Sequence, residues 1–506
     1  MSMAGTIDLH KRTSVVELAE QMEDFVRLAA GDGRSLHEVE QHLHEMVHRM
    51  GNAATGLFIA LQGDGDLGET VTTEKGVTLH RSANPVNRPL QTVFGLFNVR
   101  AYVYARGPKK KIELRPIDAR LSLPDGQASY LFEEFSQYFC VEQAFDRSIE
   151  AIERVMRQSL SKETLERINR RVGDQAEQYL DELSAPPAES EGELMVLTGD
   201  GKGVPLVKPD LASVPIFDPD ERRGHRRMAT LASVYTVNRF VRTPEDILAA
   251  LFRDPGEASQ RKPRPKPQGR QLTARFARER EFGEETEHVS GPIEAFSWAS
   301  RRVADRLQPA QPLVVLMDGA PSQWDAVPAC LDSDAAERAV DILDIIHVSQ
   351  YVWRAAKVFH YHREHQEAFA RERLRRILSG HVNGVIAGLR RMSTARQLSH
   401  TLRAEIETVC GYFQNNACRM RYDEYLSQGY PIATGVIEGA CRHLVKDRME
   451  RSGMRWSLPG AQAMLHVRAI HQSTNPTDFY DIRIRNEQTN LHPHKSLVSQ
   501  YQPCPI

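Results

Sequence analysis

Short apolar runs that each end in an aspartate are the feature that most constrains the fold. ELMVLTGD ends at Asp200, PLVVLMD ends at Asp318, and AVDILD ends at Asp344, shortly before His347. Each run is typical of a buried strand, and helical patterns follow the second and third. The sequence therefore predicts a mixed α/β sheet with its active edge at the strand ends. The glycines on both sides of Asp200 predict that the first strand delivers this residue into a glycine-rich bend.

A second feature is the segment YPIATGVIEGACRHLVKDRMERSGMRW, residues 430–456. Read as a helix from about Gly435, it places Glu438, Arg442 and Lys446 on one face. A carboxylate binds a hard metal ion, and guanidinium and ammonium groups bind phosphate oxygens. This pattern suits a divalent metal beside a phosphodiester backbone, and a solvated helix with ordinary ion pairs is the alternative. Arg451 and Arg455 add further donors.

Composition excludes some classes of protein and leaves others. The 506 residues carry 65 basic and 67 acidic side chains, so a surface that binds nucleic acid must be a local patch. The six cysteines include no CxxC pair, which argues for a reducing compartment and against a cysteine-rich zinc site. The N-terminus lacks the apolar core of a signal peptide, and no run approaches the length of a membrane span. We therefore expect a soluble intracellular protein.

The N-terminal half is expected to be mainly helical, with short β runs between about Val77 and Ala105. Residues 127–183 return to helical patterns, and Ser161 is a suitable N-cap. Two helices joined by a polar turn match a DNA-reading helix-turn-helix, with basic residues on the second helix. Any helical hairpin with a basic face gives the same pattern. The basic residues concerned are Arg167, Arg170 and Arg171.

Two further segments interrupt the predicted sheet. Residues 254–281 are rich in proline and arginine, which predicts a basic flexible loop, either a solvated linker or a tether to DNA backbone. Residues 351–415 are almost wholly helical in pattern and lie between Asp318 and Glu438 in the sequence. They predict an inserted helical subdomain.

Two strand-end aspartates and one helix glutamate can together bind a pair of divalent ions that promote in-line displacement at phosphorus. Asp200, Asp318 and Glu438 are the candidates. Each of them could instead be a turn or capping residue. Glu424 is the rival for the third acid, but it lacks the adjacent cationic residues.

The segments DGKGV, MDGAPSQWD, DIIHVSQYVWRAA and RMRYDEYLSQGYPIATGVIEGACRHLVKDRMERSGMRW resemble the DDE transposases of ISKra-type bacterial insertion sequences. The resemblance runs from about residue 75 to residue 470. It implies an RNase H-like catalytic domain interrupted by an all-helical insertion, with Asp200, Asp318 and Glu438 as the catalytic and metal-binding triad. It also implies two Mg²⁺ ions, for which Mn²⁺ could substitute, and cleavage and joining of element ends.

The same resemblance gives roles to other residues. Asp344 and His347 are similar to the (C/D)xxH signature of related Mutator-type enzymes, which implies a site-shaping role; a core aspartate and histidine are the alternative. Arg442 and Lys446 are assigned to phosphate contacts. Trp456 is hypothesised to stack on a displaced base, with a buried core tryptophan as the alternative. The segment YARGPKKKIEL lacks the cysteine pair of some relatives, so no zinc knuckle is expected.

The expected partners are terminal inverted repeats, target DNA and further copies of the chain, in the cytoplasm of a bacterium and associated with its nucleoid. An RNase H-like nuclease without strand transfer, or a transposase-derived DNA-binding protein without activity, are the alternatives. A small-molecule phosphotransferase is disfavoured because no GxxxxGK[ST] loop occurs. The expected domain organisation is an N-terminal helical region (1–75), a small β hairpin segment (76–125), a helical DNA-binding region (126–190), the catalytic domain (191–350 and 421–475), the helical insertion (351–420) and an irregular tail (476–506).

Overall fold

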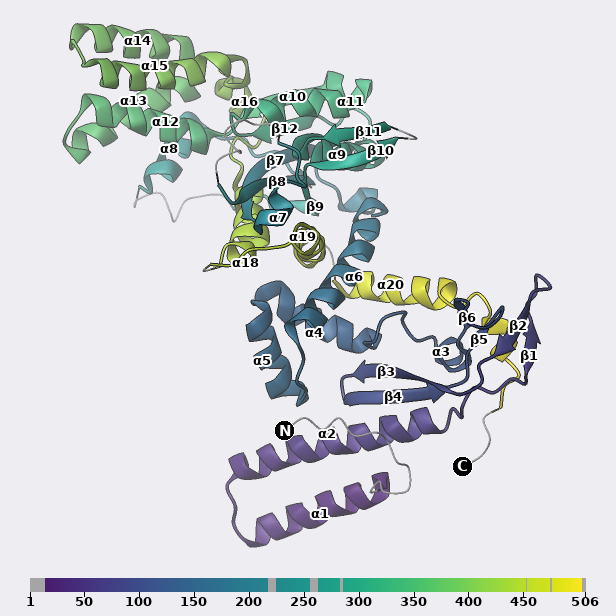
Figure 1. The fold of residues 1–506 in the computed structure, drawn as a ribbon. Coiled ribbons are helices and arrows are strands. Elements are labelled where there is room, and N and C mark those ends of the chain that lie inside the picture. Colours follow the sequence, from purple (N-terminus) through teal and green to yellow (C-terminus); the bar gives the residue numbers. More distant parts are fainter. Residues whose placement is uncertain are drawn as a thin grey trace. The chain divides into compact units, whose positions relative to one another are not determined.

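The computed structural model describes residues 14–216, 224–254, 263–282, 285–451, 453–473 and 476–502. The chain divides into two compact units (Figure 1). The first comprises Met1–Gln175 and Pro476–Ile506, and the second comprises Ala176–Asn475. The C-terminal segment therefore belongs to the same unit as the N-terminal region.

The first unit begins with a helical hairpin, α1 (Val15–Gly31) and α2 (Leu36–Ala60). A capping box starts each helix, because Ser14 and Ser35 accept hydrogen bonds from the backbone three residues on and the glutamates there bond back. The helices predicted over residues 13–50 are confirmed, and α2 continues to Ala60.

Short strands follow in the first unit, as the sequence predicts. β3 (Val86–Thr92) and β4 (Gly95–Ala101) form an antiparallel hairpin. A separate four-stranded sheet has the order β1-β2-β5-β6. Its strands are β1 (Thr70–Thr72), β2 (Thr78–Arg81), β5 (Tyr104–Ala105) and β6 (Ile112–Leu114).

Helices complete the first unit, and they include the C-terminal segment. They are α3 (Pro116–Leu121), α4 (Tyr130–Glu142), α5 (Phe145–Met156), the first part of α6 (Lys162–Asp181), α20 (Pro476–Asn490) and the 3-10 turn η7 (Lys495–Val498). The prediction of an irregular tail over 476–506 is wrong for α20. Buried Arg483 pairs with buried Glu133 of α4, so distant ion pairs hold this polar helix where the sequence offers little apolar periodicity.

The second unit is built on a five-stranded sheet with the order β13-β12-β7-β8-β9. β7 runs antiparallel to β8, and β8 antiparallel to β9. β7 runs parallel to β12, and β12 parallel to β13. This confirms a mixed α/β sheet. The strands are β7 (Leu194–Pro205), β8 (Arg226–Val237), β9 (Gln268–Phe276), β12 (Leu313–Met317) and β13 (Ala339–Leu343).

Both faces of this sheet are buried, which explains the continuous apolar runs at the start of β7 and along β12. Met195 and Leu197 pack with residues of α9 (Gly291–Arg306) and α10 (Pro321–Cys330). Leu194 and Val196 belong to the cluster on the other face, with α12 (Ile345–Phe359) and the helices that follow it. Figure 1 shows the two helical layers on the two sides.

The helices after α12 confirm the helical pattern predicted for residues 351–415. They lie side by side in Figure 1, and their apolar residues join one core with the sheet. They are α13 (Arg363–Leu378), α14 (Val382–Ala395), α15 (His400–Asn415), the 3-10 turn η5 (Ala417–Arg419) and α16 (Tyr422–Ser427). The remaining elements of the unit are η2 (Ala188–Ser190), α7 (Lys208–Leu211), α8 (Pro244–Phe252), β10 (Arg278–Phe282), β11 (Glu285–Val289), α11 (Ser333–Arg338) and α19 (Leu458–Ser473).

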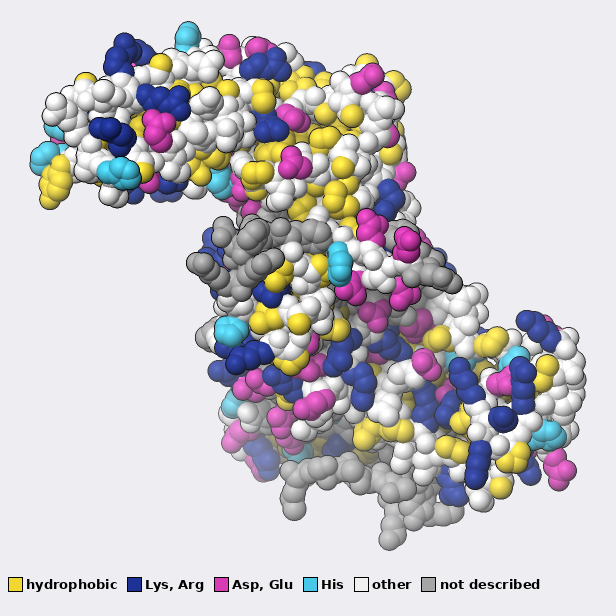
Figure 2. Space-filling view, turned by 45° about the horizontal axis from the view of Figure 1, so that its top comes forward, with side chains coloured by type: hydrophobic (Ala, Val, Ile, Leu, Met, Phe, Trp, Pro, Cys, Tyr) yellow, Lys and Arg dark blue, Asp and Glu magenta, His cyan; other side chains and the backbone are white. Residues whose placement is uncertain are grey.

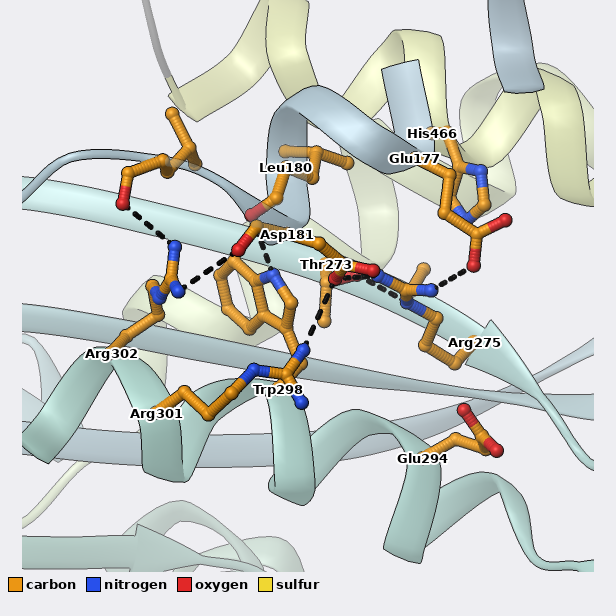
Figure 3. Close-up of polar contacts among 12 residues, drawn as sticks. Glu177, Leu180, Asp181, Thr273, Arg275, Glu294, Trp298, Arg301, Arg302 and His466 are labelled. Carbon is orange, nitrogen blue, oxygen red and sulfur yellow. Dashed lines mark hydrogen bonds and ion pairs between the residues drawn. The ribbon is translucent and has the colours of Figure 1, made fainter. Parts of the chain in front are cut away.

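The prediction of a basic flexible loop over 254–281 is wrong for most of its described part. Residues 255–262 lie outside the described residues, but β9 is an edge strand of the sheet and β10 pairs with β11. Arg275 of β9 is only 3% exposed and forms ion pairs with Glu177 and Asp181 at the end of α6. Figure 3 shows these contacts beside Trp298, whose ring nitrogen donates to the Leu180 carbonyl at 2.9 Å. Acids distant in sequence therefore neutralise the basic segment.

Candidate active site

Three aspartates lie in one row across neighbouring parallel strands: Asp318 and Asp344 directly follow β12 and β13, and Asp200 lies within β7. Met317 of β12 is paired with Gly199 of β7 and with Leu343 of β13, so the next residues are Asp318, Asp200 and Asp344. Neighbouring strands are about 4.8 Å apart. Each aspartate is an even number of residues from a strand residue that packs towards α12, so all three occupy positions on the α12 face of the sheet.

Asp200 does not lie in a bend, contrary to the sequence prediction. β7 continues through it to Pro205, and Asp200 is paired with Leu231 of β8. The glycines are needed for close packing instead. A Cβ atom on Gly199 would lie 2.4 Å from the Phe296 ring of α9. The Asp200 carboxylate accepts a hydrogen bond from the Gly201 N–H at 2.7 Å.

Glu438 reaches this row from α17 (Gly435–Ala440), far along the chain. The segment before α17 is fastened to the start of α12 by two hydrogen bonds. The Ile345 N–H donates to the Ile432 carbonyl at 2.9 Å, and the Thr434 N–H donates to the Asp344 carboxylate at 3.1 Å. As a result, ligand atoms of Asp344, His347 and Glu438 all lie within 4.8 Å of one another.

The carboxylates are close enough to perturb one another. Burial raises the pKa of Asp318, and the charges of Asp200 and Asp344 raise it further. Burial likewise raises the pKa of Glu438, with the charges of Asp344 and Asp200 acting in the same direction. The structure therefore brings the predicted acids Asp200, Asp318 and Glu438 into one electrostatic cluster.

This cluster has the donor chemistry of a divalent metal site. In the described part of the chain, no Lys or Arg forms a salt bridge with Asp200, Asp318 or Glu438. Partly buried carboxylates that repel one another are stabilised by a bound cation, and carboxylate oxygens are the ligands that Mg²⁺ and Mn²⁺ prefer. These three residues therefore fit the metal ions that the sequence predicts. Glu424, the rival acid, is exposed on α16 and pairs with Arg421 at 3.0 Å.

The helix that follows Glu438 differs from the prediction. Residues Cys441–Lys446 form a π-helical segment, η6, followed by α18 (Asp447–Met449). Because a π-helix bonds i to i+5, the regular i, i+4, i+8 face does not continue through it. Arg442 and Lys446 are both exposed, as are Arg451 and Arg455. These four cations therefore remain accessible, although not as one straight helical stripe.

Trp456 is a core residue, so the base-stacking hypothesis does not fit its position. It is 5% exposed and its ring nitrogen donates to the Met449 carbonyl at 3.2 Å. Its backbone pairs with the end of β7, because its N–H donates to the Pro205 carbonyl at 3.0 Å. The buried guanidinium of Arg448 lies 4.7 Å from the ring centroid. Trp456 thus anchors the segment after η6 to the strand that carries Asp200.

The predicted helix-turn-helix residues divide into two groups. Ser161 caps α6 as expected, accepting a hydrogen bond from the Thr164 N–H at 3.2 Å. Arg167 and Arg170 are exposed. Arg171 is half-buried and pairs with Glu133 at 2.7 Å, so it is part of an internal ion-pair network and is not a free DNA contact.

Two residues near the acids were missed by the sequence analysis. The Cys441 thiol is buried, and burial and the nearby charge of Asp200 raise its pKa. Tyr412 of α15 covers Gly319 so closely that a Cβ atom on this glycine would lie 2.3 Å from its ring. The only signal in the sequence was the glycine after Asp318, which marks a close approach but not its partner.

Surface charge agrees with the near-zero net charge. On the face drawn in Figure 2, basic and acidic side chains are interspersed over the described surface. Among the described residues, no helix combines the length and the apolar character needed to cross a bilayer.

Comparison with known proteins yields little. No protein-family model and no curated protein matches the chain. The chain is similar to a chain in the solved "Drosophila P element transposase strand transfer complex", with 11% sequence identity, 72% of this chain and 83% of that chain covered, and a TM-score of 0.23. A similarity at this level supports no assignment, so the function is inferred from the residues of the site.

Proposed function

We propose that this protein is the DDE transposase of an insertion sequence, which cleaves DNA at terminal inverted repeats and joins the ends to target DNA. The observation that carries the proposal is the row of Asp200, Asp318 and Asp344 on neighbouring parallel strands, with Glu438 brought after a helical segment to within 4.8 Å of ligand atoms of Asp344 and His347. Two aspartates and a glutamate held together can bind the pair of divalent ions that promotes in-line displacement at phosphorus.

The sheet supports an RNase H-like catalytic domain. In chain order its first three strands, β7, β8 and β9, are antiparallel neighbours. The last two, β12 and β13, are added on the other side of β7 and run parallel to it. The helical insertion between β13 and Glu438 agrees with the resemblance in the sequence, and so does the length of chain beyond a minimal nuclease.

The roles of the chain's residues follow from their positions. Asp200, Asp318 and Glu438 hold two Mg²⁺ ions, for which Mn²⁺ can substitute. Bound there, the ions would activate water or a 3′-hydroxyl and stabilise the leaving oxygen. Asp344 shapes the site, because its carboxylate bonds both the first turn of α12 and the Thr434 N–H before α17.

The exposed cations near Glu438 and on α6 are the proposed contacts to DNA phosphates, which position the duplex without reading its sequence. Terminal repeats and target DNA are the proposed partners. A homo-oligomer is proposed because two DNA ends must be held together, and the bacterial cytoplasm, at the nucleoid, is the proposed location. The cations are Arg442, Lys446, Arg451, Arg455, Arg167 and Arg170.

The test is a strand-transfer assay with the DNA that flanks the gene. Purified protein, labelled flanking DNA, a target plasmid and Mg²⁺ are incubated together, and the products are sequenced. We expect cleavage at imperfect inverted repeats and covalently joined end–target products. Nicks without joined products would instead favour an RNase H-like nuclease. Specific end binding without any cleavage would favour an inactive transposase-derived DNA-binding protein.

A further inference from the structure

His347 lies in the first turn of α12, close to the carboxylates of Asp344 and Glu438. Its Nδ1 atom is 2.7 Å from the Asp344 carboxylate. Ligand atoms of Asp344, His347 and Glu438 form a group within 4.8 Å. The side chain is 29% exposed, so the ring is partly accessible to solvent. The hydrogen bond with Asp344 raises the pKa of His347, and the charges of Asp318 and Glu438 raise it further.

Asp344 itself has little capacity left for a metal ion. It is fully buried. One carboxylate oxygen accepts hydrogen bonds from the Ile346 and Thr434 N–H groups, each at 3.1 Å. The other accepts from the His347 N–H at 3.2 Å and lies against His347 Nδ1. This carboxylate therefore holds its neighbours in place.

The contact with Asp344 determines which nitrogen of His347 is available. An ionised carboxylate can only accept hydrogen bonds, so a neutral His347 ring bonded to Asp344 carries its proton on Nδ1 and has its lone pair on Nε2. A histidine that ligates a metal almost always donates its other N–H to a carboxylate or carbonyl in this way, which fixes the ring and makes it a stronger ligand.

We propose that His347 Nε2 is a metal ligand that shares an ion with Glu438, and that Asp344 is the positioning carboxylate behind it. This inference rests on the metal site of the proposed function and adds an imidazole to its acidic ligands. Mg²⁺ prefers oxygen ligands, whereas imidazole binds well to transition-metal ions. His347 therefore biases the site towards Mn²⁺ over Mg²⁺.

The test uses Mn²⁺ and the full-length protein without DNA. Pulsed electron paramagnetic resonance detects ¹⁴N coupled to bound Mn²⁺, and calorimetry gives the affinities for Mn²⁺ and Mg²⁺. We expect ¹⁴N coupling in the wild type and its loss in His347→Gln, with Mn²⁺ affinity lower by about 10–100-fold and a smaller change for Mg²⁺. Circular dichroism and thermal melting establish that the variant is folded.

His443→Gln is the matched control. His443 is an exposed histidine on η6, paired with Asp447 at 3.1 Å, and its loss should leave the ¹⁴N coupling unchanged. Mn²⁺ bound to the wild type without nitrogen coupling, or coupling that persists in His347→Gln, would overturn the inference. If such a protein still joins DNA ends, the proposed function stands and only the role of His347 is wrong. If the wild type neither binds Mn²⁺ nor cleaves DNA, both proposals fall.

Discussion

Asp318→Asn is expected to abolish Mg²⁺-dependent cleavage of end DNA while DNA binding remains measurable. The amide keeps the size of the side chain and can still accept the hydrogen bond that the Ala320 N–H donates at 3.0 Å. It cannot supply the negative charge that binds metal. Metal stabilisation of the transition state contributes several kcal/mol, so the rate should fall on the order of 10³-fold. Single-turnover cleavage and a gel-shift assay measure the two properties.

Asp200→Asn and Glu438→Gln should give the same result, because the three carboxylates act as one site. Glu424→Gln is the matched control: it removes an exposed carboxylate on α16 and should cleave at the wild-type rate. Cleavage that survives in all three active-site variants would show that the acids have been assigned wrongly. Loss of cleavage in Glu424→Gln would restore that residue as the third acid.

The double change Arg442→Gln and Lys446→Gln is expected to weaken DNA binding and to reduce its salt dependence. Both side chains are exposed on η6, beyond Glu438. Each phosphate neutralised on duplex DNA contributes about 0.9 to the slope of log affinity against log salt, so the loss of two contacts should lower the slope by about 1.8. Fluorescence anisotropy with end DNA at several salt concentrations measures the slope.

Arg301→Gln controls for the removal of positive charge as such. Arg301 is half exposed on α9, which covers the opposite face of the sheet from the acidic residues. For the Arg301→Gln variant, the slope of log affinity against log salt should equal that of the wild type. An unchanged slope in the double variant would remove Arg442 and Lys446 from the DNA contacts, whatever the activity of that variant.

The positions of Asp200, Asp318 and Asp344 could be predicted because local sequence determines them. A short apolar run buried on both faces forms a central strand, and parallel strands end at one edge. The pairing of Met317 with both Gly199 and Leu343 then places the aspartates in one row. Glu438 required the resemblance to a family, because no local pattern relates α17 to a strand far upstream.

The features that sequence reasoning missed depend on contacts between distant segments. β9 pairs with β8, and its buried Arg275 forms ion pairs with Glu177 and Asp181 of α6. α20 is a helix although its apolar periodicity is weak, and Arg483 pairs with Glu133 of α4. A pattern of prolines and charges cannot reveal such partners. Residues 254–281 and 476–506 were therefore predicted to be irregular.

Packing between distant segments also explains why the bend predicted at Asp200 is wrong and why the sequence left two roles open for Trp456. The glycines around Asp200 suggested a bend, but both lie within β7, where Gly199 leaves room for Phe296 of α9 and Gly201 lies close to Met228 of β8. Trp456 could be read either as a stacking platform or as a core residue, and its contacts with Met449 and Pro205 favour the core. The sequence shows which residue types are present, but their structural roles depend on the side chains that pack against them.

Anomalous diffraction from crystals soaked in Mn²⁺ tests the central claim most directly, because it locates the bound ions without reference to activity. We expect Mn²⁺ density in contact with the carboxylates of Asp200, Asp318 and Glu438, and its disappearance in crystals of Asp318→Asn. Mn²⁺ bound elsewhere, with these carboxylates left without an ion at saturating concentration, would contradict the account.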